Sequence, residues 1–287
     1  MASHVERVVD AHIHLWDPAR TDWYPYLTGL RDVGMGDLTG WARYFDQKIY
    51  FAESANWNVE KFVHVAAASD FVGETLEKEA EAEATGHPDA IVGGVAAAGP
   101  VADAIAGLDR QMAASRFRGV RPMGGVLENG VPPDDVLRAL QERKLVFDLM
   151  AHPDQQLAAA EALDGWNELT VVVEHTGWPH TNTDDEYQLW MTGMSRLAAL
   201  GPNVHCKLSG LAMPFRTMNP EVFRRWIEYS LETFGVDRCF FGSNFPPDSA
   251  GGSFDELYGT FATLTDGLDA EDREKLFAAN AERVYRC

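Results

Sequence analysis

The sequence predicts an α/β protein with a single (β/α)8 TIM-barrel domain over residues 1–287. Eight apolar runs of strand length alternate with segments of helical periodicity, as in such a barrel. The runs are rich in β-branched and aromatic residues and mostly lack a polar stripe, which is typical of parallel strands buried on both faces. No linker, charge block or low-complexity tract divides the chain. A doubly wound open sheet is the alternative, but no glycine-rich phosphate turn follows the first run.

The elements can be placed by residue number. The expected strands cover residues 8–13, 62–66, 91–96, 117–121, 145–151, 170–174, 204–208 and 239–241. The expected helices cover residues 71–85, 101–114, 134–144, 154–163, 185–200, 220–234, 254–264 and 269–285. Gly86 ends the first helix, while Pro220 and Gly235 mark the start and end of the sixth.

The connection after the first strand, residues 15–50, is much longer than the usual βα loop of about 2–6 residues. In a barrel it emerges at the carboxyl-terminal face, where active sites lie. We expect most of its aromatic residues to pack on the barrel rim and one or two to line a substrate pocket, with Trp16 as the candidate. These aromatic residues are Trp16, Trp23, Tyr24, Tyr26, Trp41, Tyr44 and Phe45.

Composition excludes several classes of function. The formal net charge of −20 repels phosphate backbones, so nucleic-acid binding is not expected, and an anionic substrate would need basic residues gathered at the site. The sequence shows no apolar core of a signal peptide and no run of about 18 apolar residues that would span a membrane. Three cysteines without a CxxC pair fit a reducing cytoplasm, and we expect the protein to be there. The sequence leaves open whether the protein forms a homo-oligomer.

The first strand carries the sequence Asp10-Ala11-His12-Ile13-His14. Strict alternation predicts that Asp10, His12 and His14 share one face. Two imidazoles one residue apart could bind a single divalent cation. The alternative is one surface histidine and one hydrogen-bonded core histidine.

Two further histidines follow expected strands. His152 ends the fifth strand and is a third candidate metal ligand beside His12 and His14. His175 follows the sixth strand and is a candidate general base, because its proton affinity can be tuned near neutral pH. Each could instead be an ordinary structural histidine.

Two cations lie inside apolar strands, where a charge is expensive unless it is paired or faces a polar site. Arg121 is on the fourth strand, and Lys207 shares one face of the seventh with Ser209. We expect all three to contact the substrate, with Arg121 and Lys207 holding an anionic group. Salt bridges within the barrel are the alternative for the two cations.

The eighth strand is followed by Asn244 and, four residues later, Asp248. Asn244 stands where a rim carboxylate would complete a metal site, but an amide is a weaker ligand and does not take up a proton at neutral pH. Asp248 could replace it if the intervening Pro-Pro turn folds back.

Together these motifs resemble the amidohydrolase-2 family of TIM-barrel metal-dependent hydrolases, especially the branch of sugar lactonases and 2-pyrone-4,6-dicarboxylate lactonase. The resemblance implies that His12 and His14 are metal-site positions, that His175 is the strand-six histidine, and that Asn244 occupies the strand-eight aspartate position. No lysine on the fourth strand could carry a bridging carboxylate, which argues against a binuclear centre, and lactonases of this branch can work without a metal. The motifs are VVDAHIHLWDP, FRGVRP, VFDLMAHPD, VVVEHTGWP, VHCKLSGL and FFGSNFPPD.

The leading hypothesis is a hydrolase that opens a lactone or related cyclic ester with an activated water. His175 would act as base or carbonyl polariser, and Asn244 would position the water. The cofactor would be one divalent cation, Zn or Mn, held by His12, His14 and His152, or none, because Asn244 replaces the usual aspartate.

Two alternatives remain open at this point. One is a metal-dependent non-oxidative decarboxylase acting on a small carboxylic acid, which His152 favours and Asn244 weakens. The other is a barrel that binds a small ligand without turnover.

Overall fold

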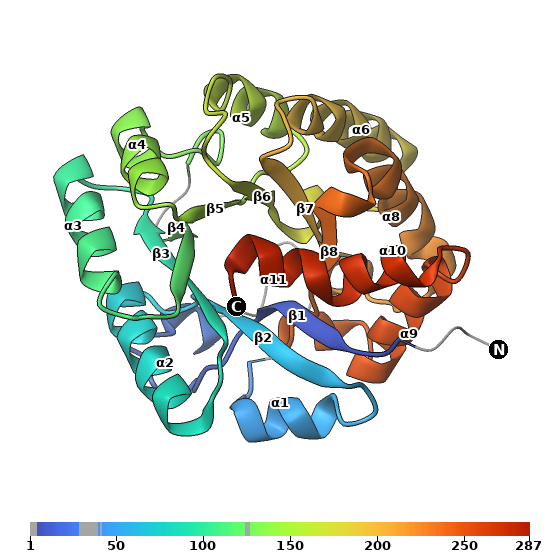
Figure 1. Cartoon of the computed structure of the whole chain (residues 1–287), viewed down its shortest axis with the longest axis horizontal. Coiled ribbons are helices and arrows are strands. Elements are labelled where there is room, and N and C mark those ends of the chain that lie inside the picture. The colour runs from blue at the N-terminus through green and yellow to red at the C-terminus, as the bar shows by residue number, and fades with distance from the viewer. Residues whose placement is uncertain (1–4, 29–39, 41, 124–126) are drawn as a thin grey trace.

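Eight parallel strands form a sheet in which β1 to β8 follow one another in sequence order, with helices around the outside (Figure 1). The computed structural model describes residues 5–28, 40, 42–123 and 127–287. The predicted (β/α)8 barrel is confirmed. The strands are β1 (Val8–Ile13), β2 (Val59–Val65), β3 (Ala90–Ala96), β4 (Phe117–Met123), β5 (Val146–Leu149), β6 (Val171–Val173), β7 (Val204–Leu208) and β8 (Cys239–Phe241).

The helices match the predicted ones to within a few residues, with three differences. Helix α1 lies inside the segment expected to be loop, α7 was not expected, and the last helix is interrupted by a π-helical turn, Lys275–Ala279. The helices are α1 (Gln47–Glu53), α2 (Phe71–Thr85), α3 (Val101–Gln111), α4 (Asp134–Glu142), α5 (Gln156–Ala162), α6 (Asp184–Ala198), α7 (Ala212–Phe215), α8 (Pro220–Phe234), α9 (Phe254–Leu264), α10 (Ala270–Glu274) and α11 (Asn280–Tyr285).

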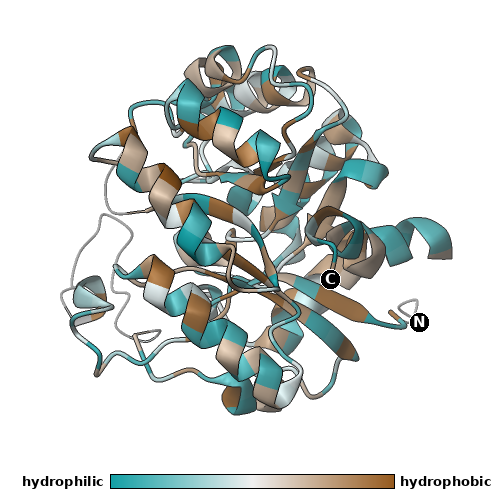
Figure 2. Cartoon of the chain, turned by 60° about the vertical axis from the view of Figure 1, so that its left-hand side comes forward, coloured by the Kyte–Doolittle hydropathy of each residue, from teal (hydrophilic) through white to brown (hydrophobic). Residues whose placement is uncertain are grey.

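Helix ends follow local chemistry. The side chain of Asn219 accepts a hydrogen bond at the start of α8, and Ser253 forms a capping box with Glu256 at the start of α9. Gly86 ends α2 with a φ of 94°, a conformation in which a side chain would be strained. Polar faces of the outer helices are turned to solvent (Figure 2).

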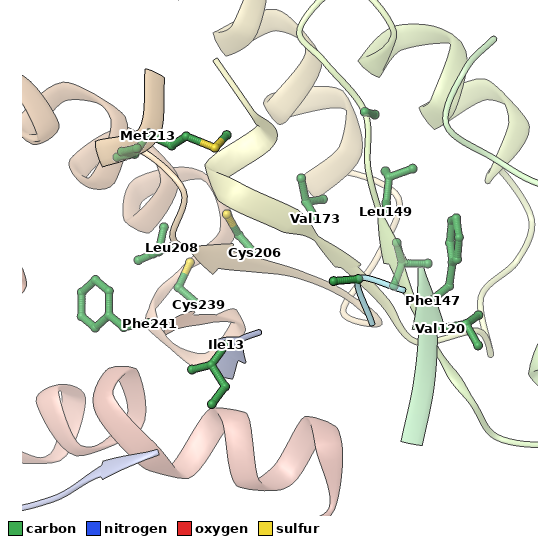
Figure 3. Close-up of a cluster of buried hydrophobic side chains, with 14 of the residues drawn as sticks. Ile13, Val120, Phe147, Leu149, Val173, Cys206, Leu208, Met213, Cys239 and Phe241 are labelled. Carbon is green, nitrogen blue, oxygen red and sulfur yellow. The ribbon is translucent and has the colours of Figure 1, made fainter. Parts of the chain in front are cut away.

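Alternation along the strands separates two apolar layers. One set of strand residues packs under the helices, including Phe147, Leu149, Cys206 and Leu208 (Figure 3). Burying each such side chain contributes about 1.5–3 kcal/mol. The other set forms a second buried cluster that includes Val9, Val63, Val92, Val146, Val172 and Phe240.

Helix α11 covers one end of this second cluster (Figure 1). Ala281, Val284 and Tyr285 pack against residues near the amino ends of the strands, and the Tyr285 hydroxyl donates to Asp148 at 2.9 Å. Because this end is filled, the carboxyl ends of the strands are left to form the site.

The barrel closes between β1 and the segment after β8. The amide of His14 donates to Phe245 O, and the amide of Asn244 donates to His12 O, both at 2.8 Å. The carboxylate of Asp10 strengthens this junction, because it accepts from the amides of His12 and Ser243 and from the Tyr50 hydroxyl of α1.

The long connection after β1 packs on the rim where the structure describes it. Tyr24 and Phe45 are buried, while Tyr44 is 52% exposed. Trp41 lies outside the described residues. No helix in the described part of the chain is both long and apolar enough to cross a membrane.

Replacing Asp10 with alanine tests the closure. Three buried donors would lose their acceptor, so we expect the free energy of unfolding to fall by about 3 kcal/mol. Denaturant unfolding measures this, with the exposed Asp164→Ala as the matched control. Equal stability of the two variants would show that the carboxylate does not hold the barrel closed.

Candidate active site

The imidazoles of His12 and His14 meet at the carboxyl end of β1, as predicted. Their Nε2 atoms are 3.2 Å apart and both rings are buried. The prediction that Asp10 shares their face is wrong. The pairing of β1 with β2 shifts register between Asp10 and Ile13, and this irregularity turns His12 inward while Asp10 contacts α1.

A backbone acceptor identifies the tautomer of His14, and the tautomer of His12 follows from its contacts with His14 and Lys207. His14 Nδ1 is 2.8 Å from the carbonyl oxygen of Val65, which only accepts, so Nδ1 carries the proton. Nε2 of a neutral His14 therefore has a free lone pair and accepts from His12 Nε2. Nδ1 of His12 in turn accepts from the ammonium of Lys207 at 3.4 Å.

Strand β6 leads into a left-handed turn, residues 175–178. His175, Thr176, Gly177 and Trp178 have φ values of 53°, 55°, 70° and 49°. Left-handed backbone costs a non-glycine residue about 1–2 kcal/mol, so surrounding bonds must hold this turn in place. It directs His175 and the preceding Glu174 into the mouth of the barrel.

Three hydrogen bonds to neighbouring segments hold the left-handed turn. The hydroxyl of Thr176 donates to Ser209 O at 3.1 Å, and the indole of Trp190 donates to Thr176 O at 2.7 Å. Gln156 donates to Gly177 O at 2.7 Å. The partners lie on α5, on α6 and in the segment directly after β7, so the turn is fixed before any substrate arrives.

Glu174 is the carboxylate at the centre of the site, and sequence reasoning missed it. Its side chain is fully buried, and neither oxygen has a hydrogen-bond partner among the described residues. Oε1 lies 3.4 Å from His12 Nδ1 and 3.8 Å from Lys207 Nζ, while Oε2 lies 3.6 Å from Arg121. The side chain of Val172 points into the barrel, and strand alternation therefore predicts that the side chain of Glu174 points inward as well.

The two predicted substrate cations differ in their surroundings. Lys207 is completely buried and donates to Asp148 at 2.6 Å, which favours the salt-bridge alternative over substrate contact. Burial raises the pKa of Asp148, and the adjacent ammonium opposes that rise. Arg121 donates from Nε to Ala66 O and keeps a small exposed fraction, 10% of its side chain.

The imidazoles are held in their neutral form. Burial, followed by the positive charges of Arg121 and Lys207, holds the pKa of His175 well below its usual value. Burial, Lys207 and the neighbouring His175 do the same for His12, and burial with Arg121 lowers the pKa of His14. Neutral imidazoles keep a lone pair for a proton or a cation.

Ser209 orients His175 rather than facing solvent. Its hydroxyl is 3.1 Å from Nδ1 of His175, and both side chains are buried. The ring also lies directly against Gly210, where an added Cβ would approach its atoms to 2.5 Å. A side chain at position 210 would therefore displace His175.

Asn244 and Asp248 form a pair behind the site. The amide nitrogen of Asn244 donates to Asp248 at 2.9 Å, so its oxygen faces the other way. Asp248 also accepts from the amides of Ala212 and Met213, and burial raises its pKa to about 7. The chain folds back as anticipated, but Asp248 does not join the group of close ligand atoms.

His152 lies away from the predicted ligand group, while Trp16 lines a cavity on the rim together with Tyr24 and Phe45. The ring of His152 packs on His180 and Trp178, with centroid distances of 4.3 and 5.1 Å, rather than joining His12 and His14. Trp16 is buried and stacks on His14 at 5.4 Å, while its indole donates to Arg43 O. Trp16 therefore supports His14 from the side.

One group among the described residues could hold a metal ion: His12, Glu174 and His175, whose ligand atoms all lie within 4.8 Å of one another. Two imidazoles and a carboxylate form a ligand set that zinc uses, and the unpartnered oxygens of Glu174 fit such a role. His152 is not in this group, so the predicted ligand set His12, His14 and His152 is not brought together.

Sequence comparisons place these residues in a family. A family model described as Amidohydrolase matches residues 9–287. The uncharacterized protein y4mH of Sinorhizobium fredii is 30% identical, covering 97% of this chain and 98% of that protein. An L-fucono-1,5-lactonase of Burkholderia ambifaria is 29% identical, covering 97% and 95%.

Solved structures agree on the fold. An amidohydrolase of Burkholderia multivorans with bound Zn superposes with a TM-score of 0.81 at 23% identity, covering 97% of this chain and 99% of that one. A putative 2-pyrone-4,6-dicarboxylic acid hydrolase of Pseudomonas putida gives 0.70 at 20% identity, covering 97% of each chain. The chain belongs to the amidohydrolase family and is an enzyme of the hydrolase type.

Proposed function

We propose that this enzyme opens a lactone or a closely related cyclic ester by attack of water. The observation that carries the proposal is the convergence of neutral His12 and His175 on Glu174 at the barrel mouth, with His14 in contact with His12. An ester needs one group to accept a proton from water and one to stabilise charge on the carbonyl oxygen, and this site offers both. The lactonase named among the relatives supports the substrate class.

The two alternatives receive less support. The decarboxylase hypothesis depended on His152 as a third histidine ligand, and that ring packs on His180 instead. Membership of a hydrolase family argues against a barrel that only binds its ligand.

His175 is the proposed proton acceptor. We place the proton of His175 on Nδ1, where it would donate to the Ser209 hydroxyl 3.1 Å away, so that Nε2 keeps its lone pair. As the water oxygen bonds to the ester carbon, Nε2 takes the water proton. When the ring carbon–oxygen bond breaks, that proton passes to the departing alkoxide, and a hydroxy acid is released.

Arg121 and Asn244 would orient the reactants. The guanidinium of Arg121 is held by Ala66 O and faces Glu174, where it can stabilise negative charge on the carbonyl oxygen or an anionic substituent. The side-chain oxygen of Asn244 can accept a hydrogen bond from the water, because Asp248 occupies its amide nitrogen.

A divalent cation also fits the donors of His12, Glu174 and His175. Bound there, it would polarise the ester carbonyl and lower the pKa of a bound water. A nitrogen that binds a cation cannot accept a proton, so the two uses of His175 exclude each other. We assign Nε2 of His175 to proton transfer, because both Glu174 oxygens already have a positive charge nearby. Oε1 lies 3.8 Å from Lys207 and Oε2 lies 3.6 Å from Arg121.

Replacing His175 with alanine should lower kcat/KM for lactones by about 10²–10⁴-fold, the usual contribution of a general base. The assay follows acid release from a panel of γ- and δ-lactones. The matched control is His87→Ala, since His87 precedes β3 at the opposite end of the barrel. Full activity of the His175 variant would remove the proposed role.

Removal of metal tests the assignment of His175. We expect lactone hydrolysis to survive dialysis against a chelator, with Zn and Mn substoichiometric by elemental analysis of protein purified without a metal-chelating tag. The opposite result would be one tightly held ion per chain whose removal abolishes activity. If the His175→Ala variant also lacks that ion, His175 is a metal ligand.

A further inference from the structure

Glu74 is a buried carboxylate that the proposed reaction does not use. It lies in the first turn of α2, outside the barrel (Figure 1), and its side chain is fully buried. Oε2 accepts from the amides of Ala67 and Ala68, both at 2.9 Å. These two residues follow β2, so a helix outside the sheet holds the segment at the carboxyl end of a barrel strand.

The two peptide groups that Glu74 holds also face the site. The amide of Ala67 belongs to the same planar peptide group as Ala66 O, and in a trans peptide the N–H and the C=O point in opposite directions. Arg121 donates from Nε to Ala66 O at 2.9 Å. One rigid group therefore has Glu74 on one side and Arg121 on the other. The next peptide group lies between Glu74 and the Tyr26 hydroxyl, which donates to Ala67 O at 2.8 Å.

The other oxygen of Glu74 is also held, so the carboxylate cannot rotate freely. The Tyr24 hydroxyl donates to Oε1 at 3.2 Å, and Nε2 of the buried His64 lies 3.5 Å from the same atom. Nδ1 of His64 accepts from the amide of Leu15, which directly follows His14. Glu74 is therefore connected to the carboxyl ends of both β1 and β2.

The charge of Glu74 strengthens its hold on the backbone. Burial raises the pKa of this carboxyl group, but His64 and the amides of Ala67 and Ala68 outweigh burial, so the pKa lies below its usual value. Hydrogen bonds to an ionised acceptor are roughly twice as strong as those between neutral groups. Such an acceptor polarises the peptide group and makes its carbonyl a better acceptor for Arg121.

We propose that Glu74 is a positioning residue, which fixes the Arg121 guanidinium beside Glu174 through the peptide group between Ala66 and Ala67. The inference rests on the proposed lactone hydrolysis, in which Arg121 stabilises charge on the carbonyl oxygen. Glu74 lies behind the site and acts only through Arg121. A misplacement of about 1 Å at a reacting centre can lower a rate about 10²-fold.

The test compares Glu74→Ala with Glu79→Ala, a matched control on the same helix. Glu79 is also buried, but it accepts from the Ser115 hydroxyl and the Arg116 amide, which precede β4 at the opposite end of the barrel. Both variants should lose stability. Only Glu74→Ala should lower kcat for an uncharged lactone, by about ten- to a hundredfold with little change in KM, because the charge that Arg121 stabilises develops in the transition state.

Two further variants separate positioning from a general structural effect. Glu74→Gln keeps a side-chain oxygen for the two amides and should restore most of kcat. In an Arg121→Ala background, Glu74→Ala should lower kcat no further, because residues that act through one another are not additive. If Glu74→Ala does not fold, Glu74→Asp, which is shorter by one methylene, replaces it in each comparison.

A second readout does not depend on activity. ¹⁵N NMR of arginine-labelled protein follows hydrogen exchange at Nε of Arg121, and the resonance is assigned by its loss in Arg121→Ala. We expect roughly tenfold faster exchange in Glu74→Ala and the natural rate in Glu79→Ala, because only the first variant loosens the hydrogen bond to Ala66 O.

The outcomes separate the two proposals. If the natural enzyme opens no lactone, the proposed function fails, while exchange at Arg121 Nε still tests the positioning. The role of Glu74 is overturned if Glu74→Ala lowers kcat by the same factor with and without the Arg121 side chain. It is also overturned if Nε–H of Arg121 exchanges at the natural rate in Glu74→Ala.

Discussion

The carboxylate of Glu174, buried between Arg121, Lys207, His12 and His175, is the constraint on which the site depends. A lone buried carboxylate would be strongly disfavoured, so the two cations around it are required rather than incidental. The same cations suppress protonation of the adjacent imidazoles. One charge network therefore surrounds the buried carboxylate with positive charge and keeps the neighbouring imidazoles neutral.

This network extends through the barrel, from the end that α11 covers to the carboxyl ends of the strands. Tyr285 of α11 donates to Asp148, Asp148 pairs with Lys207, and Lys207 reaches His12 and Glu174. The last helix thus connects to the catalytic mouth through three successive polar contacts. Fold stability and site geometry share these residues, so changes in α11 can affect the site at a distance.

Strand alternation predicts much of this arrangement, and local backbone departures explain the rest. Period-two alternation is enough to place His12 and His14 together and to turn Arg121 and Lys207 inward. It fails for Asp10, because the register of β1 shifts beside it. It also could not reveal the left-handed turn after β6, since three of that turn's four residues are not glycine. Glu174 precedes that turn and follows the alternation from Val172, so it was overlooked rather than hidden. The ring of His152, which follows β5, packs on Trp178 and His180 rather than joining His12 and His14.

The central claim is that His12, His14 and His175 remain neutral, with the proton of His14 and of His175 on Nδ1. Side-chain ¹⁵N NMR of histidine-labelled protein, recorded from about pH 5 to about pH 8, tests this directly, because an ordinary histidine titrates in that range. The account predicts neutral ¹⁵N shifts for all three rings throughout, with Nδ1–H tautomers for His14 and His175. Titration of any of the three near the ordinary value of 6.5 would contradict it.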